Sequence, residues 1–180
     1  MKEKEVKILN IDKAEVEERL LKLGAKKVFD GEIASFFFDF KDGSIAKSNS
    51  VLRLRKEGIK VLLTFKKVVD SQSVKVAEEH YVEVSDLGEA EMILKSLGLS
   101  VAESMQKRRV SYQFNCVHFD IDKYVGKYGH IPVFLEIEAE SIDSIYRYAE
   151  LLGFKAEDCL PWSVKELVNH YPTERQSETK

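Results

Sequence analysis

Short runs in which charged and apolar residues alternate recur along this chain, and they constrain its fold more than any other feature. They lie at residues 3–9, 51–55, 61–66, 119–122 and 134–138. Successive side chains of a β-strand point to opposite faces, so each run gathers its charged groups on one face and its apolar groups on the other. The runs therefore predict a β-sheet with one charged face, and that face must either meet water or line a cavity.

The composition is typical of one globular domain. The chain has 180 residues, of which 44% are hydrophobic, enough to bury a core. A third of the residues are charged, yet the formal net charge is only −3, which argues against a broad nucleic-acid surface. No run approaches the ~18 apolar residues of a membrane-spanning helix, and the charged first residues do not resemble a signal peptide. We therefore predict that neither nucleic acid nor membrane is a partner.

The chain has two cysteines, Cys116 and Cys159, which lack the paired spacing of a metal site. A reduced, cytoplasmic location is the simplest interpretation of this usage. The sequence does not fix the oligomeric state and leaves a homodimer open.

Turn and capping residues divide the chain into eight expected strands and four expected helices. The strands cover residues 3–10, 26–40, 50–57, 59–69, 75–84, 101–114, 116–125 and 133–140, and the helices cover 12–23, 86–97, 141–152 and 163–171. Antiparallel closure would remove the exposed edges of such a sheet. The expected fold is α+β: a closed antiparallel eight-stranded β-barrel, forming a tunnel, with flanking helices. We expect a single domain over residues 1–171, followed by a polar tail (172–180) that frays.

The charged groups on the repeated faces belong to two chemical classes. The basic members are Lys7, Arg53, Arg55, Lys66, Lys107 and Arg109, and the acidic members are Glu3, Glu5, Asp120, Asp122, Glu136 and Glu138. Carboxylates bind hard cations such as Mg²⁺ or Mn²⁺, and guanidinium and ammonium groups bind phosphate. Any one of these strands is more simply explained by a solvated charged face. However, an unpartnered buried charge costs several kcal/mol, so a barrel with this interior needs a charged ligand or extensive mutual pairing.

Six motifs, taken in order, resemble the CYTH family, whose members include class IV adenylyl cyclases, thiamine triphosphatases and inorganic triphosphatases. Such proteins are also called triphosphate tunnel metalloenzymes. The motifs are Glu3-x-Glu5-x-Lys7, Leu52-Arg53-Leu54-Arg55, Thr64-Phe65-Lys66, Lys107-Arg108-Arg109, Asp120-x-Asp122 and Phe134-Leu135-Glu136-Ile137-Glu138. The similarity covers about residues 1–170.

The resemblance implies a polar tunnel that binds a triphosphate and a divalent metal, Mg²⁺ or Mn²⁺. By position, Lys7, Arg53, Arg55, Lys66, Lys107 and Arg109 would bind the triphosphate, and Glu3, Glu5, Asp122, Glu136 and Glu138 would hold metal. Of these, Lys7, Arg53, Arg55, Lys66 and Glu138 are the implied catalytic residues. The ligand that the resemblance implies is a triphosphate-containing small molecule: ATP, tripolyphosphate or thiamine triphosphate.

One segment departs from the family pattern. Relatives often carry an arginine and an extra glutamate in the strand around residues 76–81, where this chain has Ala77 and Tyr81. Glu79 is still expected to face inward. The contribution of this strand to the choice of substrate stays open.

The resemblance leaves three functions to compare. The first is a metal-dependent phosphohydrolase in which water attacks the terminal phosphorus of a triphosphate. The second is a class IV adenylyl cyclase, in which the ribose 3′-hydroxyl of ATP attacks the α-phosphorus and pyrophosphate leaves. The third is a non-catalytic binder of polyphosphate or nucleotide. Retention of both glutamate pairs argues against the third, because a pure anion binder does not need them.

Overall fold

The computed structural model describes residues 2–70 and 75–172, without the side chains of residues 2, 3, 68–70, 75 and 76. Of the predicted tail at 172–180, residues 173–180 lie outside the described residues. The strands are β1 (Lys2–Ile8), β2 (Lys26–Phe40), β3 (Ser50–Glu57), β4 (Lys60–Asp70), β5 (Lys75–Glu83), β6 (Leu99–Phe114), β7 (Val117–Tyr124) and β8 (Phe134–Ala139). The helices are α1 (Lys13–Leu23), α2 (Ser44–Lys47), α3 (Leu87–Ser96), α4 (Ile142–Leu151) and α5 (Val164–His170), with 3₁₀ turns η1 (Gly126–Tyr128) and η2 (Ala156–Asp158).

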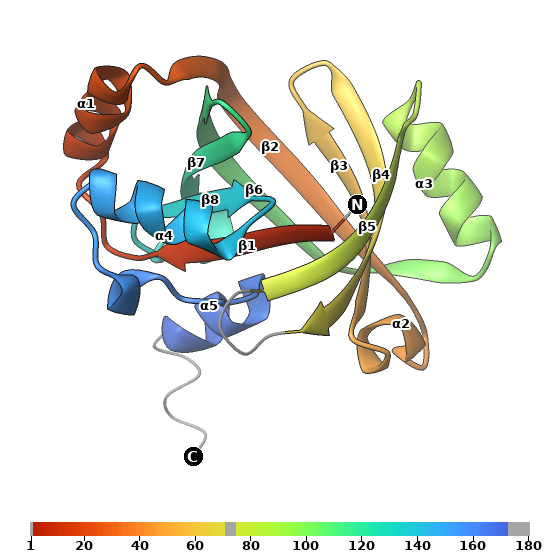
Figure 1. Cartoon of the computed structure of the whole chain (residues 1–180). Coiled ribbons are helices and arrows are strands. Elements are labelled where there is room, and N and C mark those ends of the chain that lie inside the picture. Colours follow the sequence, from red (N-terminus) through yellow and green to blue (C-terminus); the bar gives the residue numbers. More distant parts are fainter. Residues whose placement is uncertain (1, 71–74, 173–180) are drawn as a thin grey trace.

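The strands form one curled antiparallel sheet in the order β1-β5-β4-β3-β2-β6-β7-β8 (Figure 1). β1 pairs with β8 over Lys4–Ile8 and, on its other edge, with β5 over Lys2–Glu5. Beyond the residues that pair with β5, this edge of β1 pairs with Leu160. Lys7 and Leu160 exchange two backbone hydrogen bonds of 2.8 and 2.9 Å. The expected α+β fold, an eight-stranded antiparallel sheet with flanking helices, is confirmed.

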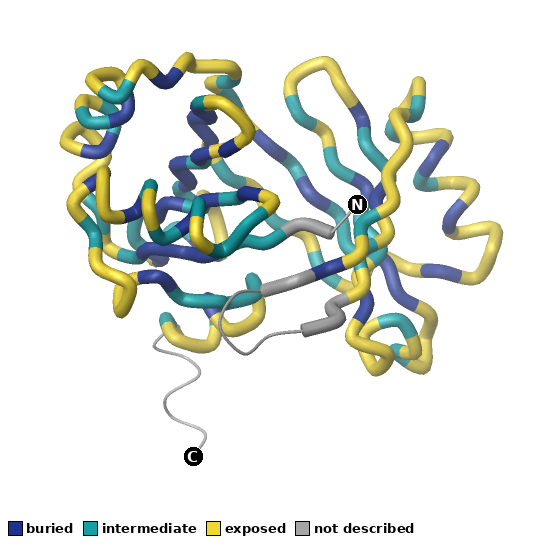
Figure 2. Tube along the Cα trace, in the orientation of Figure 1, coloured by how far each residue is buried: buried dark blue, intermediate teal, exposed yellow. Residues whose placement is uncertain are grey.

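Helices cover the outer face of the sheet on two sides. α1 and α4 pack against β1, β6, β7 and β8 through a core that includes Leu20, Phe119 and Ile145. On the opposite side of the molecule, α3 packs on the sheet through Leu94, against Phe38 and Leu54 (Figure 1). Figure 2 shows the buried segments of these helices turned toward the sheet and their exposed segments turned away from it. Because the outer face is the apolar one, the charged face of the strands is left for the inside of the curl.

The predicted helix starts are correct because the capping residues behave as expected. The side chains of Asp12, Asp86, Ser141 and Ser163 each accept a hydrogen bond from the backbone N–H three residues on. Gly24 ends α1 with a φ of +90°, a conformation that favours glycine.

α2, η1 and η2 were not predicted from the sequence. α2 is held by the carboxylate of Asp39, at the end of β2, which accepts the N–H groups of Phe40, Ile45 and Ala46. Asp39 lies outside this four-residue helix, and so short a helix has no periodic pattern of apolar residues that could be recognised in the sequence. Among the described residues, no helix combines the length and the hydrophobicity needed to cross a bilayer.

Candidate active site

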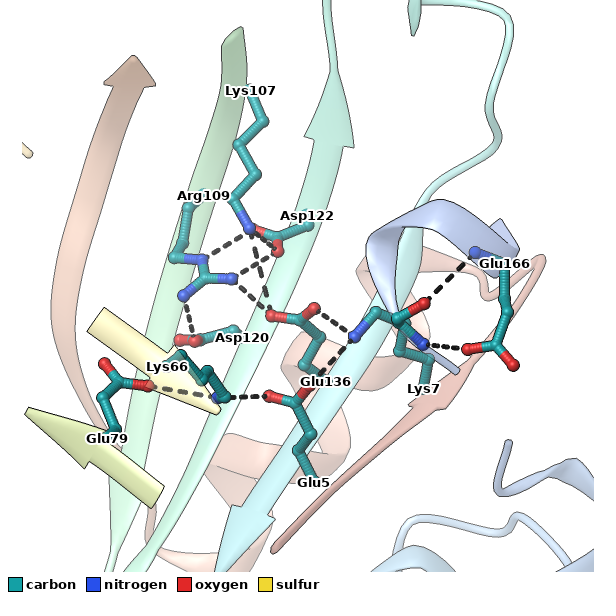
Figure 3. A network of polar contacts seen from close by, with 11 residues as sticks. Glu5, Lys7, Lys66, Glu79, Lys107, Arg109, Asp120, Asp122, Glu136 and Glu166 are labelled. Carbon is teal, nitrogen blue, oxygen red and sulfur yellow. Dashed lines mark hydrogen bonds and ion pairs between the residues drawn. The ribbon is translucent and has the colours of Figure 1, made fainter. Parts of the chain in front are cut away.

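The register of the strands brings the predicted charged residues together on the inner face. Lys7 lies opposite Glu136 in the β1–β8 ladder, and Asp120 lies opposite Glu136 in the β7–β8 ladder. Arg109 lies opposite Asp122 in the β6–β7 ladder. Residues far apart in the sequence therefore form one network of alternating charge, which Figure 3 shows from close by.

Lys7 is a buried cation on β1, with 1% of its surface exposed. Its Nζ lies 2.8 Å from a carboxylate oxygen of Glu136 and 3.6 Å from one of Glu5. Burial alone would lower the pKa of Lys7, but the two carboxylates outweigh it and raise that pKa. Lys7 therefore stays charged in the unliganded protein.

Arg109 lies at the centre of the acidic part of the network. Its Nε donates to Asp122 at 2.7 Å, and its other nitrogens pair with Asp120 and Glu136. Burial opposes the charge, yet Asp122 and Asp120 raise the pKa of Arg109 well above its usual value. The buried guanidinium is thus fully compensated by carboxylates.

Glu136 and Asp122 connect these cations. Burial would raise the pKa of Glu136, but Lys7, Lys107 and Arg109 hold it well below its usual range. Asp122 is 0% exposed and also accepts a hydrogen bond from Lys107 at 2.5 Å. In this arrangement the carboxylate of Asp122 fixes two basic side chains, and no part of it meets solvent.

Lys66 joins the network from the other side of the curl. Its Nζ lies 3.1 Å from Glu79 and 3.6 Å from Glu5 (Figure 3). Glu79 was expected to face inward but was not among the predicted site residues. Ala77, two residues before it, is buried, whereas Tyr81 is 67% exposed.

Among the described side chains, Arg53 and Arg55 on β3 contact fewer carboxylates than Arg109 does. Arg53 approaches Glu79 only at 4.0 Å, and Arg55 lies 3.1 Å from Glu57. The Nε atoms of both are buried and have no hydrogen-bond partner in the described part of the chain. Burial and the neighbouring charge of Arg55 lower the pKa of Arg53 to about 10. Buried donors are nearly always satisfied, so this pair is prepared for an anion.

The acidic residues offer the oxygen donors that a hard divalent cation prefers. Glu5 and Glu138 lie opposite each other in the β1–β8 ladder, and Glu138 also lies opposite His118 of β7. Among the described residues no three acidic, histidine or cysteine side chains lie close enough to hold a metal ion as they stand. The side chain of Glu3, another predicted ligand, lies outside the described residues. The chemistry of these donors therefore fits a hard divalent cation.

Known proteins resemble this chain in sequence and in fold. A protein of Methanocaldococcus jannaschii named putative adenylate cyclase MJ0240 is 29% identical over 143 residues, which is 79% of each chain. The structure of the PH1012 protein from Pyrococcus horikoshii OT3 is 28% identical, with a TM-score of 0.77, over 93% of this chain and 99% of that one. A putative adenylyl cyclase from Hippeastrum shares the fold at 15% identity, with a TM-score of 0.62, over 85% of this chain and 88% of that one. The CYTH domain matches residues 1–178, and this chain therefore belongs to the CYTH family.

Proposed function

We propose that this protein is a divalent-metal-dependent phosphohydrolase that acts on a triphosphate bound inside the closed, charged tunnel of its β-barrel. The observation that carries the proposal is the pair of buried, unsatisfied Nε atoms of Arg53 and Arg55. They face a network in which acidic and basic groups already compensate each other. An incoming polyanion would therefore find its first unsatisfied donors on β3.

In this proposal different basic residues bind different phosphates of the triphosphate. Arg53 and Arg55 bind phosphate oxygens through their guanidinium groups, which suit oxygen pairs. Lys7, Lys66, Lys107 and Arg109 supply further positive charge around the remaining phosphates. Their carboxylate partners hold them in position before the substrate arrives, so less reorganisation is needed in the transition state.

Glu3, Glu5, Glu136 and Glu138 are the residues we propose to hold Mg²⁺ or Mn²⁺. A bound divalent cation supplies charge neutralisation at the phosphate oxygens. Asp122 was predicted as another ligand. Because Lys107 and Arg109 enclose it, we propose instead that it positions those two basic side chains.

The reaction is an in-line displacement at the terminal phosphorus. A bond forms between a water oxygen and this phosphorus, and the bond to the bridging oxygen breaks, leaving a diphosphate. We assign Glu138 to orient the water and take up its proton. Lys7, Arg53, Arg55 and Lys66 stabilise the negative charge that shifts to the leaving oxygens. ATP, tripolyphosphate and thiamine triphosphate are the candidate substrates.

A class IV adenylyl cyclase is the second candidate, because the M. jannaschii relative is named a putative adenylate cyclase. The same basic residues would bind the phosphates of ATP while its ribose 3′-hydroxyl attacks the α-phosphorus. The Hippeastrum protein, also named an adenylyl cyclase, is described as having a dominant triphosphatase activity. That description favours hydrolysis as the first assignment for this protein. Its cytoplasmic location stays a prediction from the sequence.

Product analysis separates the candidates. Purified protein is incubated with ATP, tripolyphosphate or thiamine triphosphate, each with Mg²⁺, with Mn²⁺ and with EDTA, and phosphate, pyrophosphate and cyclic AMP are resolved. Metal-dependent release of phosphate is the expected result. Cyclic AMP with equimolar pyrophosphate would instead identify a cyclase, and tight binding without turnover of any substrate would identify a non-catalytic binder.

A further inference from the structure

Three consecutive phenylalanines in β2 divide between the two faces of the sheet. Phe36 and Phe38 pack in the apolar cluster beneath α3, together with Leu54 of β3. Because successive side chains of a strand point to opposite faces, Phe37 lies on the inner, charged face. It is partly buried there and belongs to none of the apolar clusters formed by the described residues. An aromatic ring therefore lies among the charged groups of the inner face, apart from the described core.

The register places Phe37 beside the arginine that is prepared for an anion. β2 runs between β3 and β6 in the sheet (Figure 1), and Phe37 lies directly opposite Arg53 of β3. The Cβ atoms of directly opposed residues in an antiparallel pair are roughly 5 Å apart. The Nε of Arg53 is buried and has no hydrogen-bond partner in the described part of the chain. A phosphate bound by this guanidinium would therefore hold its substituent within reach of the Phe37 ring.

The neighbour of Phe37 on its other side is acidic, and it sets the direction in which a ligand can lie. Glu103 of β6 lies opposite Phe37, and its carboxylate accepts hydrogen bonds from Tyr128 at 2.7 Å and from Lys127 at 3.1 Å. Burial opposes its ionisation, but these hydrogen bonds lower the pKa of Glu103, so it is charged at neutral pH. A negative carboxylate disfavours phosphate on that side of Phe37. The phosphates of a ligand are therefore directed toward Arg53 and away from Glu103.

We propose that the organic group of the substrate stacks on Phe37 through a planar aromatic ring. Arg53 binds a phosphate of the same molecule, and Glu103 keeps the phosphates on the side of Arg53. The preferred substrate is therefore a triphosphate ester of an aromatic compound, such as a nucleoside triphosphate, and not inorganic tripolyphosphate. Phe37 is the specificity-determining residue. This inference rests on the proposed function only in taking the ligand to be a triphosphate.

Titration calorimetry of the full chain in EDTA tests the stacking without turnover. The probes are ATP, ribose 5-triphosphate, which lacks the aromatic ring, and tripolyphosphate, which lacks the organic group. Phe37→Leu removes the ring and keeps an apolar side chain, whereas Phe37→Tyr keeps a ring. Phe40→Leu is the matched control, because Phe40 lies in the same strand on the opposite face and is exposed.

Stacking of a base on an aromatic side chain predicts that Phe37→Leu binds ATP roughly tenfold to a hundredfold more weakly than the wild type does. Its affinities for ribose 5-triphosphate and tripolyphosphate should match those of the wild type. Phe37→Tyr should retain the affinity for ATP, and Phe40→Leu should bind all the probes as the wild type does. Unchanged affinity of Phe37→Leu for ATP would overturn the inference. An equal loss of affinity for all the probes would also overturn it, because Phe37 would then support the phosphate site itself.

Failure of the proposed function would look different. If the wild type binds ATP and tripolyphosphate but releases no phosphate with either metal, hydrolysis is refuted, and the binding of ATP by Phe37→Leu still decides the inference. If the wild type binds tripolyphosphate but not ATP, stacking on Phe37 is refuted and the phosphate site stands. If it binds neither, both proposals are refuted.

Discussion

Two arginines on the inner face, the buried Arg109 and the partly buried Arg53, should respond to the same substitution in opposite ways. Arg109 is surrounded by Asp120, Asp122 and Glu136. In contrast, the Nε of Arg53 has no hydrogen-bond partner among the described residues, and a terminal nitrogen of its guanidinium approaches Glu79 only at 4.0 Å. Replacing either by methionine removes the charge and keeps most of the side-chain volume. We expect Arg109→Met to destabilise the unliganded protein and Arg53→Met to leave it equally or more stable.

The expected change in the free energy of unfolding of Arg53→Met follows from the pKa of Arg53. Burial, with the repulsion of Arg55 second, lowers this pKa from 12.5 to about 10. At about 1.4 kcal/mol per pH unit, the folded state disfavours the charge by roughly 3 kcal/mol. The contact with Glu79 and lost packing offset part of the gain, so we expect the free energy of unfolding of Arg53→Met to rise by about 1 kcal/mol. Arg109→Met leaves buried carboxylates uncompensated and should lower it by about 3 to 5 kcal/mol.

Urea denaturation at pH 7 measures both effects, first without ligand and then with tripolyphosphate. The wild type should gain stability as tripolyphosphate is added, because binding to the folded state stabilises it by mass action. In Arg53→Met, most of this stabilisation by tripolyphosphate should be lost, although the unliganded variant is itself stable. The reasoning is refuted if Arg53→Met is destabilised as much as Arg109→Met, or if it keeps the full response to tripolyphosphate.

Three further predictions concern single residues. The pKa of Glu136 is depressed in the folded state, so its stabilisation is complete above the ordinary value of 4.5 and declines as the pH falls from 4.5 toward the lowered pKa. Glu136→Gln should therefore cost about 3 kcal/mol in urea denaturation at pH 7, and this cost should shrink progressively as the pH is lowered below 4.5. Glu138→Gln should lower the rate of metal-dependent phosphate release at least about tenfold, while Glu32→Gln, at an exposed site, should not; equal rates would remove Glu138 from the site. Gly24→Ala introduces a side chain at a φ of +90°, and calorimetric unfolding should show a loss of about 1 kcal/mol.

The faces of the strands could be predicted from the sequence because alternation with a period of two fixes which residues share a side. Lys7, Arg109 and Glu136 were placed on the inner face in this way. The pairing among them could not be predicted, since it depends on the register between strands that lie far apart in the sequence. That Glu136 lies opposite both Lys7 and Asp120 is a property of the folded sheet.

One contact of β1 had a weaker signal in the sequence. Leu160 pairs with Lys7 through a single bridge, too short to leave a strand pattern.

Hydrolysis in ¹⁸O-labelled water tests the central claim most directly. The protein is incubated with tripolyphosphate or ATP and Mg²⁺ or Mn²⁺ in labelled water, and the products are analysed by mass spectrometry. Attack of water on the terminal phosphorus predicts one ¹⁸O atom in the released orthophosphate and none in the diphosphate product. Label in the diphosphate product alone, or unlabelled pyrophosphate accompanied by cyclic AMP, would contradict the proposed reaction.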